Sequence, residues 1–307
     1  MTGEPRRVRW LLMLMAIPLL ILAGLLASSV FGQHHDALPA PVRPPVAPAR
    51  VAPAAAAARP AAAPAFLPAG AERLQVGEGA RGATIFRPRG AAGRAGPVVI
   101  LLHGWVAIDP RRYGPWIAHL VRGGATVIYP AYQTKPARET ASPLANVLAG
   151  VRAALSHVAI APGRLVVAGH SVGAALAADY AAVAAAADLP APAAILSVYP
   201  GRRLRHLATP IPSVDLSAIA PGTRLLTLAG ERDRSVGSDT ARRIVADATR
   251  ANATLRIVRD DAVDDHSAPR RSDAHARRAF WRPLDELLAA TAPVAPDRSG
   301  ASALPGQ

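Results

Sequence analysis

The feature that most constrains the fold is a regular alternation of short apolar runs with longer helix-like segments. Runs such as PVVILLHG and RLVVAGH are almost wholly apolar, which is typical of strands buried on both faces. Strands alternating with helices predict an α/β fold: a doubly wound, mostly parallel sheet with helices on both faces. We expect strands at residues 83–89, 97–104, 125–132, 164–170, 193–201, 223–230 and 253–258, and helices at 109–124, 142–158, 171–187, 238–251 and 272–290.

The N-terminal segment, residues 1–32, has the pattern of a signal-anchor or a signal peptide. Residues 10–31 carry no charge, and arginines precede them. This length is close to the about 20 residues of a membrane-spanning helix. Arginines on the N-terminal side predict that the rest of the chain lies outside the cytoplasm. A helix that anchors the protein in the cell membrane and a cleaved signal that releases it are both compatible with the sequence.

Two further segments differ from the apolar alternation. Residues 33–66 are rich in proline and alanine. Frequent prolines disfavour helices and paired strands, so we expect a disordered, extended linker. Residues 67–291 then form the folded domain, and residues 292–307 a flexible tail.

The charge and the cysteine count exclude some classes of function. The formal net charge is +14, but the arginines are scattered and few aromatic residues lie between them. We therefore predict no nucleic-acid partner and interpret the charge as a basic surface near an anionic membrane. The chain has no cysteine, which excludes disulfides and cysteine-ligated metals, and we predict no metal site.

The segment LVVAGHSVGAALAADY, residues 165–180, contains the motif Gly169-His170-Ser171-Val172-Gly173. On its own this pattern is weak in a chain rich in glycine and alanine. Here it follows a buried-type strand and opens a helix, as a nucleophile elbow requires. Ser171 is therefore the candidate nucleophile, and the two glycines would let strand and helix approach closely.

The elbow and its context resemble the α/β-hydrolase fold family, in its lidless esterase and lipase-like form, over residues 70–290. In that family an acid and then a histidine follow the nucleophile. The resemblance places the acid in the turn of TRLLTLAGERDRSVG, where Gly230, Asp233 and Val236 match the family pattern. Glu231 is the local rival to Asp233.

The resemblance places the histidine in the loop after the last strand, where His266 lies. His275 is the alternative, but we expect it in the final helix, out of reach of the elbow. The family also uses a His-Gly turn after an early strand, here His103 and Gly104, to aim a backbone N–H at the active site. The implied oxyanion donors are then the N–H groups of Trp105 and Val172, with His103 and His170 as supporting residues.

These parts together imply a serine hydrolase that cleaves carboxylic esters through an acyl-enzyme intermediate, without a cofactor. Only about 22 residues separate two late strands where many lipases carry a lid, so we expect an open site for small-molecule or surface-exposed esters. Acyl transfer, thioester or peptide cleavage, and a non-catalytic binding role on the same fold remain open. The oligomeric state does not follow from the sequence.

Overall fold

The computed structural model describes residues 59–61, 64–91, 96–136, 140–203 and 211–291, all within the unit Ala52–Gln307. The predicted membrane segment, most of the predicted linker and the predicted tail lie outside these residues. Within the described ranges, no helix combines the length and the apolar character needed to cross a bilayer.

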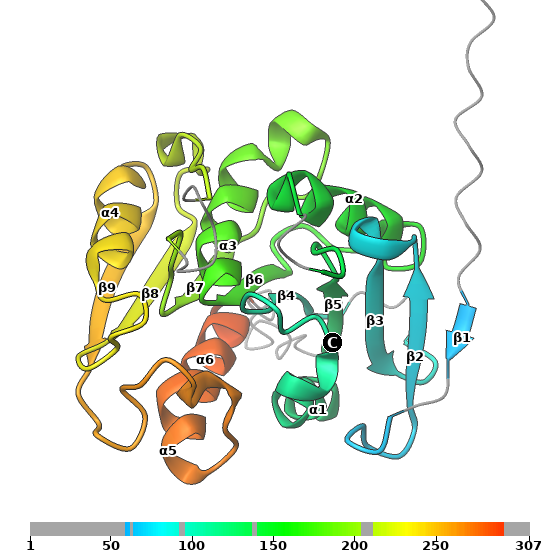
Figure 1. Ribbon diagram of the computed structural model, residues 1–307. Coiled ribbons are helices and arrows are strands. Elements are labelled where there is room, and N and C mark those ends of the chain that lie inside the picture. The colour runs from blue at the N-terminus through cyan, green and yellow to red at the C-terminus, as the bar shows by residue number, and fades with distance from the viewer. Residues whose placement is uncertain (1–58, 62–63, 92–95, 137–139, 204–210, 292–307) are drawn as a thin grey trace, which may run out of the picture. The chain divides into compact units, whose positions relative to one another are not determined.

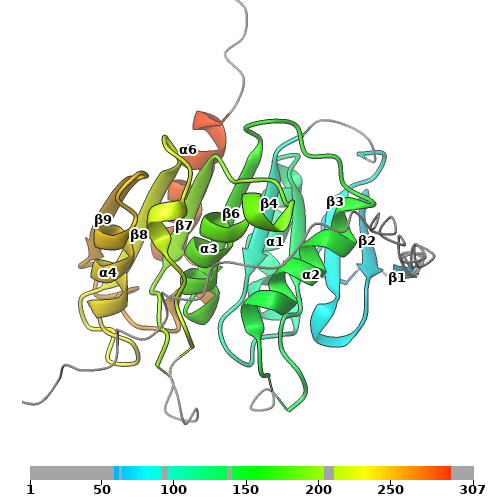
Figure 2. The same ribbon diagram turned by 90° about the horizontal axis from the view of Figure 1, so that it is seen from above.

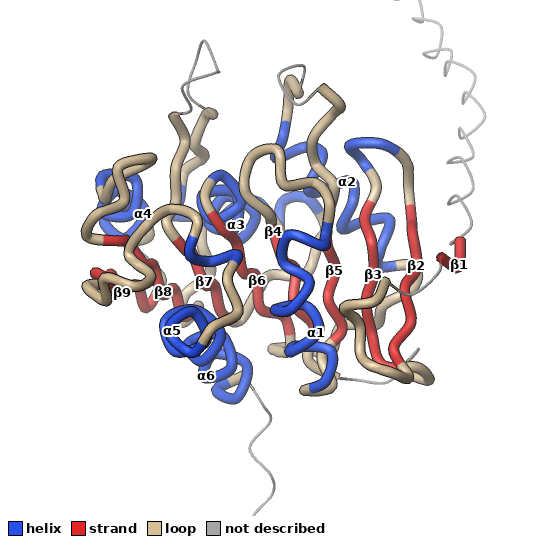
Figure 3. The backbone as a smooth tube through the Cα atoms, turned by 60° about the horizontal axis from the view of Figure 1, so that its bottom comes forward, coloured by secondary structure: helices blue, strands red, loops and turns tan. Residues whose placement is uncertain are grey.

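The described strands form one sheet in the order β1-β2-β3-β5-β4-β6-β7-β8-β9 (Figures 1 and 3). Strands β4 to β9 run parallel to one another, whereas β1, β2 and β3 join by antiparallel pairing on the far side of β5. The bounds are β1 Arg59–Ala61, β2 Ala71–Val76, β3 Ala83–Pro88, β4 Val98–Leu102, β5 Thr126–Pro130, β6 Leu165–His170, β7 Ala194–Val198, β8 Arg224–Gly230 and β9 Asn252–Val258.

Helices cover both faces of this sheet (Figure 2). Helices α2, α3 and α4 pack on one face of the sheet, and α1 and α6 pack on the other. One apolar cluster lies between the sheet and the helices on each face. The bounds are α1 Gly114–Arg122, α2 Pro143–Leu155, α3 Val172–Val183, α4 Asp239–Asp247, α5 Ala274–Ala276 and α6 Arg282–Ala290, with a π-helical stretch Arg277–Trp281 between the last two. Short 3-10 helices occupy Gly79–Arg81, Pro110–Tyr113, Ala185–Ala187, Leu216–Ala218 and Ala268–Arg270. The predicted fold class is confirmed.

The burial of each strand follows from its place in the sheet. Every residue of β4, β5, β6 and β7 is buried, because helices cover both faces of these central strands. Strand β9, at the edge, alternates between exposed and half-buried residues along most of its length. The continuous apolar runs in the sequence therefore mark the centre of the sheet.

Helix α1 begins and ends at local signals. The Asp109 carboxylate accepts a hydrogen bond from the Arg111 N–H and caps the 3-10 turn that leads into the helix. Gly123 then ends α1. The face that carries Trp116 and Ile117 is buried against the sheet, as the sequence predicts.

The order of the strands indicates that a ligand site lies at the carboxyl ends of the central strands. After β4 the chain moves through α1 to β5, and then returns through α2 to β6 on the other side of β4. In doubly wound sheets, ligands bind at the carboxyl ends of the strands beside such a reversal. Here the residues that follow β4 and β6 are His103 and Ser171.

The antiparallel strands β1 and β2 are not predicted by the sequence pattern. Arg59–Ala61 pair with β2 although they lie in the tract for which we expect no paired strand. Pro60 is compatible with this pairing because β1 is an edge strand, where a missing N–H need not break a ladder. Strand β2, which mixes polar and apolar residues, is also missed by the apolar-run criterion.

Candidate active site

Ser171 lies in a sharp turn between β6 and α3 with φ 59° and ψ −123°. A positive φ is costly for a residue with a side chain, so neighbouring backbone must hold it. The Ser171 N–H donates to the Val198 carbonyl at 3.0 Å, and the Gly201 N–H donates to the Ser171 carbonyl at 3.2 Å. The end of β7 thus fixes the turn.

The two motif glycines are required by close backbone contacts. A Cβ on Gly169 would overlap the Gly173 carbonyl, and a Cβ on Gly173 would overlap the carbonyls of Leu102 and His103. Helix α3 can therefore start directly against the ends of β4 and β6 only because both positions lack side chains. The sequence motif predicts glycine at both positions for this reason.

The structure brings three of the predicted site residues into one hydrogen-bonded chain. His266 Nε2 lies 2.9 Å from Ser171 Oγ, and His266 Nδ1 lies 2.7 Å from Asp233 Oδ2. A carboxylate only accepts, so Nδ1 carries a hydrogen and Nε2 of the neutral ring is free to accept the serine proton. The three side chains come from residues far apart in the sequence.

Asp233 is oriented by its own turn. Its Oδ1 accepts the backbone N–H groups of Ser235 at 2.9 Å and Val236 at 3.3 Å, which leaves Oδ2 for His266. The Asp233 side chain is fully buried, whereas 22% of the His266 side chain is exposed. The base is therefore open to solvent on one side while its carboxylate partner is not.

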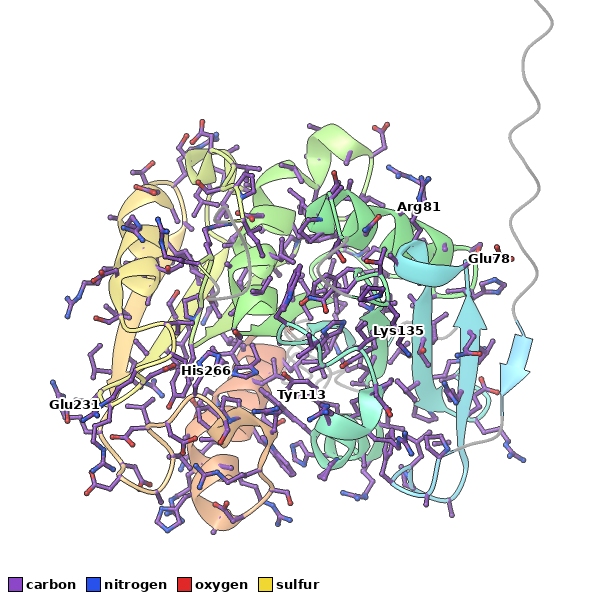
Figure 4. The ribbon with its side chains drawn as sticks, viewed as in Figure 1. Glu78, Arg81, Tyr113, Lys135, Glu231 and His266 are labelled. Carbon is purple, nitrogen blue, oxygen red and sulfur yellow. The ribbon has the colours of Figure 1, made fainter. Side chains whose placement is uncertain are left out.

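The two rival residues lie in other contacts. The Glu231 side chain points outward, where it pairs with Arg259 at 3.1 Å, and Figure 4 shows it at the margin of the molecule, away from His266. His275 lies in α5, as expected, and its Nδ1 contacts Asp260 Oδ2 at 2.7 Å. Neither residue contacts Ser171.

The His103-Gly104-Trp105 turn packs against the nucleophile. A Cβ on Gly104 would come within 3.4 Å of the Ser171 Cβ. The N–H groups of Trp105 and Val172, the predicted oxyanion donors, have no hydrogen-bond acceptor among the described residues. Val172 directly follows Ser171, and Trp105 directly follows Gly104, so within the described residues both N–H groups are without an acceptor beside positions that pack at the nucleophile.

His103 is held away from Ser171 Oγ. Its ring is fully buried and stacks on Tyr132 at a centroid distance of 4.2 Å. Its two nitrogens face the carbonyls of Gly104 and Ala131, at 2.7 and 3.0 Å. Burial lowers the pKa of His103 to about 4, although the two carbonyls raise it. A ring bound in this way supports the turn and has no free nitrogen for the serine.

His170 lies beneath the site. It is 3% exposed, and its ring centroid is 5.0 Å from that of His266. Its Nε2 lies 2.9 Å from the His266 carbonyl oxygen. His170 therefore forms a hydrogen bond with the backbone of the candidate base, while its ring packs beside the imidazole of that base.

Sequence reasoning missed several residues that hold these loops. Val106 has φ 60°, unusual for a β-branched residue, and its N–H donates to Gln133 Oε1 at 2.9 Å. Arg232 binds Asp264 through Nε at 2.7 Å, which ties the turn of the acid to the loop of His266. These contacts span 27 and 32 residues, so no local pattern reports them.

Metal-ligand groups and cavities within the described residues do not extend this site. No group of three or more metal-ligating side chains occurs within the described ranges. A cavity of about 520 Å³ lies between α1 and the α5–α6 segment, lined by residues that include His119, Trp281 and Asp285. None of the predicted site residues lines it.

Comparisons with solved structures agree with this architecture. One of two fungal esterases from Rhizomucor miehei matches with a TM-score of 0.56 at 19% identity, over 72% of this chain and 83% of that one. An esterase/lipase from an uncultured bacterium matches with a TM-score of 0.55 at 19% identity, over 73% and 87%. An esterase from the bacterial hormone-sensitive lipase family gives 0.50 at 19%, over 74% and 86%. At these identities the likeness is one of fold.

Sequence comparisons lead to the family. No curated protein sequence matches the chain. The family model described as the alpha/beta hydrolase fold matches residues 99–254, just over half of the chain, and this range includes Ser171 and Asp233. The chain belongs to the alpha/beta hydrolase fold family.

Proposed function

We propose that this protein is a serine hydrolase that cleaves carboxylic esters through an acyl-enzyme intermediate. The observation that carries the proposal is the chain from Ser171 Oγ through His266 to Asp233, with contacts of 2.9 and 2.7 Å, at a serine held in a strained turn. Serine is a weak nucleophile by itself, and a neutral imidazole at this distance activates it.

In the proposed first step, Ser171 Oγ attacks the ester carbonyl while His266 Nε2 takes the hydroxyl proton. Asp233 stays ionised, keeps the hydrogen on Nδ1 and stabilises the imidazolium that forms. The N–H groups of Trp105 and Val172 stabilise the charge that develops on the carbonyl oxygen. His266 then gives its proton to the departing alcohol as the carbon–oxygen bond breaks.

In the second step, water replaces the alcohol. His266 takes a proton from water, the hydroxide attacks the acyl carbon, and the proton returns to Ser171 Oγ as the acid leaves. The partial exposure of His266 supports this step, because 22% of its side chain is open to water. No cofactor enters the proposed reaction.

Hydrolysis of p-nitrophenyl esters of graded acyl length tests this function. We expect turnover by the intact protein and a loss of roughly 10³-fold or more in Ser171→Ala. Ser197→Ala is a matched control, since Ser197 is also a buried serine and its hydroxyl donates to the Ala174 carbonyl. Equal loss in both variants, or none in Ser171→Ala, contradicts the proposal.

The proposed substrate class follows from the segment between β7 and β8. Between β7 and β8 the described residues hold one 3-10 helix, Leu216–Ala218, while 204–210 lie outside the described ranges. We propose small or surface-exposed esters as substrates.

From the apolar segment at residues 10–31 we also propose that the protein lies outside the cytoplasm, either anchored in the membrane or released from it. Membrane fractionation with N-terminal sequencing tests the location.

A further inference from the structure

A second buried hydrogen-bonded chain links the two sides of the site. The Gly104 N–H donates to Tyr113 Oη at 2.9 Å, and Tyr113 Oη lies 2.7 Å from His170 Nδ1. His170 Nε2 lies 2.9 Å from the His266 carbonyl oxygen. The chain thus runs from the turn of the oxyanion donor to the backbone of the base, and the proposed reaction steps use neither Tyr113 nor His170.

The direction of every hydrogen bond in this chain follows from its ends. The His266 carbonyl only accepts, so His170 must carry its hydrogen on Nε2. His170 Nδ1 is then an acceptor and takes the Tyr113 hydroxyl hydrogen, which leaves the Tyr113 oxygen to accept from Gly104. One tautomer of a neutral His170 satisfies all three bonds.

Burial keeps both side chains in this state. Tyr113 is 1% exposed and His170 is 3% exposed. Burial lowers the pKa of His170 well below its ordinary value, and the positive charges of Arg270 and a protonated His266 act in the same direction. Burial raises the pKa of Tyr113 to about 12, although the Gly104 hydrogen bond lowers it. Neither group is therefore charged near neutral pH.

The hydrogen-bonded chain of Tyr113 and His170 is also tightly packed where it meets the turn of residues 103–105, which carries the proposed oxyanion donor. A Cβ on Gly104 would lie 3.2 Å from His170 Nδ1, 3.3 Å from Tyr113 Oη and 3.4 Å from the Ser171 Cβ. A side chain at Gly104 would fit only if these three neighbours each moved by a few tenths of an ångström. A shift of Tyr113 or His170 would therefore move the turn relative to Ser171.

We propose that Tyr113 and His170 are positioning residues that set the spacing between the Trp105 N–H and the His266 imidazole. The inference rests on the proposed function and goes beyond it, because it couples the oxyanion donor to the base through side chains that touch no substrate. Such coupling matters most in the transition state, where both groups act at once. Its loss should lower kcat and leave KM nearly unchanged.

Tyr113→Phe keeps the buried ring and removes only the linking hydroxyl. We expect kcat for a p-nitrophenyl ester to fall roughly 10- to 100-fold, less than the loss of an oxyanion donor itself, with KM within about twofold. Binding of benzeneboronic acid, whose serine adduct is tetrahedral, should weaken by a similar factor.

Tyr180→Phe is the matched control. Tyr180 is fully buried in α3, and its hydroxyl donates to the Pro190 carbonyl at 3.0 Å. Both variants remove one buried tyrosine hydroxyl, so both should lower the urea midpoint of unfolding, Tyr113→Phe by somewhat more because its hydroxyl makes two hydrogen bonds and that of Tyr180 one. Only Tyr113→Phe should lower kcat. A kcat in Tyr113→Phe within twofold of the unmodified protein, or an equal kcat loss in Tyr180→Phe, overturns the inference.

Rescue at His170 separates positioning from packing. In His170→Gln the amide supplies one acceptor and one donor, as the ring does, whereas His170→Leu supplies neither. We expect Gln to retain at least about tenfold more kcat than Leu at similar stability. Equal kcat in the two variants overturns the inference. If the unmodified protein hydrolyses no ester, the proposed function fails instead, so the two failures are distinguishable.

Discussion

The described residues contain two histidine–aspartate pairs with the same separation and very different surroundings. His266 Nδ1 and His275 Nδ1 each lie 2.7 Å from an aspartate Oδ2, of Asp233 and Asp260 respectively. The Asp233 side chain is fully buried, whereas Asp260 and His275 are 39% and 47% exposed. The other nitrogen of His266 faces Ser171, and His275 has no serine contact.

The difference shows that a short distance alone does not make a catalytic base. An exposed pair competes with water and is screened by salt, so it holds its geometry weakly. The Asp233 carboxylate is instead fixed by two backbone N–H groups, and its one remaining oxygen aims at the histidine. Burial and direction distinguish the two pairs, and each of the following substitutions tests one of these differences.

The largest expected effect is at the histidines. His266→Ala removes the proton acceptor of Ser171, so kcat/KM for ester hydrolysis should fall by roughly 10³- to 10⁶-fold. His275→Ala removes only a surface contact and should leave kcat/KM within about twofold. A larger loss in His275→Ala than in His266→Ala would mean that the base is assigned wrongly.

The aspartates should show the next largest contrast. In Asp233→Asn the amide no longer fixes the hydrogen on His266 Nδ1, and kcat should fall by about 10⁴-fold. Asp260→Asn alters an exposed pair and should change kcat by less than about twofold. Steady-state kinetics of both variants, with circular dichroism to verify folding, measure this. Comparable kcat values in the two variants would contradict a special role of the buried Asp233 in orienting the histidine.

A smaller effect is expected where the loops of the buried pair cross. A Cβ on Gly230 would overlap the Asp264 carbonyl and lie 3.2 Å from Tyr199 Cζ. Gly230→Ala should push the loop of His266 away, lower kcat/KM roughly 10-fold and cost about 1–3 kcal/mol of unfolding free energy.

Gly222→Ala is the control for this substitution. Gly222 has φ 80° and no atom near its Cβ position, so alanine there should cost stability, by about 1–2 kcal/mol, without affecting turnover. Urea unfolding and ester kinetics are measured for both variants. Unchanged turnover in Gly230→Ala would show that the loop crossing does not hold His266 in place.

The smallest expected effect concerns the pH dependence of stability at the buried histidines. Burial lowers the pKa of His103 to about 4 in the folded protein. In the unfolded chain the pKa is about 6.5, so between these two pH values the unfolded chain binds a proton that the folded protein does not bind. The stabilisation is complete above about pH 6.5. It is lost as the pH falls from about 6.5 towards 4, by about 1.4 kcal/mol per pH unit.

Urea unfolding at pH 7.5 and pH 5.0 measures this loss. We expect His103→Gln to reduce the difference in unfolding free energy between the two pH values, by about 2 kcal/mol. His275→Gln, at an exposed histidine, should leave the difference nearly unchanged. An identical pH dependence in His103→Gln and the unmodified protein would contradict the buried, neutral state of His103.

The sequence predicts the parts of the fold that depend on local signals. The apolar runs of β4 to β7 mark strands covered on both faces, and Gly169 and Gly173 mark the close approach at the elbow. Strand β1, at the edge, and its neighbour β2 escape prediction because they are short or partly polar. Their pairing depends on neighbours in the sheet and not on their own pattern.

The site divides in the same way. Ser171 follows a strand in a recognisable elbow pattern, and the family resemblance of that pattern implies Asp233 and His266, so these three positions could be proposed from the sequence. Tyr113 and Gln133 could not, because their roles depend on contacts with residues 57 and 27 positions away. A buried tyrosine and a glutamine in a loop have no pattern that distinguishes support of a site from ordinary packing.

Labelling with a fluorophosphonate tests the central claim most directly, because the reagent reacts with an activated serine and needs no knowledge of the substrate. Peptide mass spectrometry locates the label. We predict that it lies on Ser171, that it forms at least about 100-fold more slowly in His266→Ala, and that His275→Ala is labelled at the normal rate. Absence of label on Ser171 in the folded protein, or equal rates in all three proteins, would contradict the account.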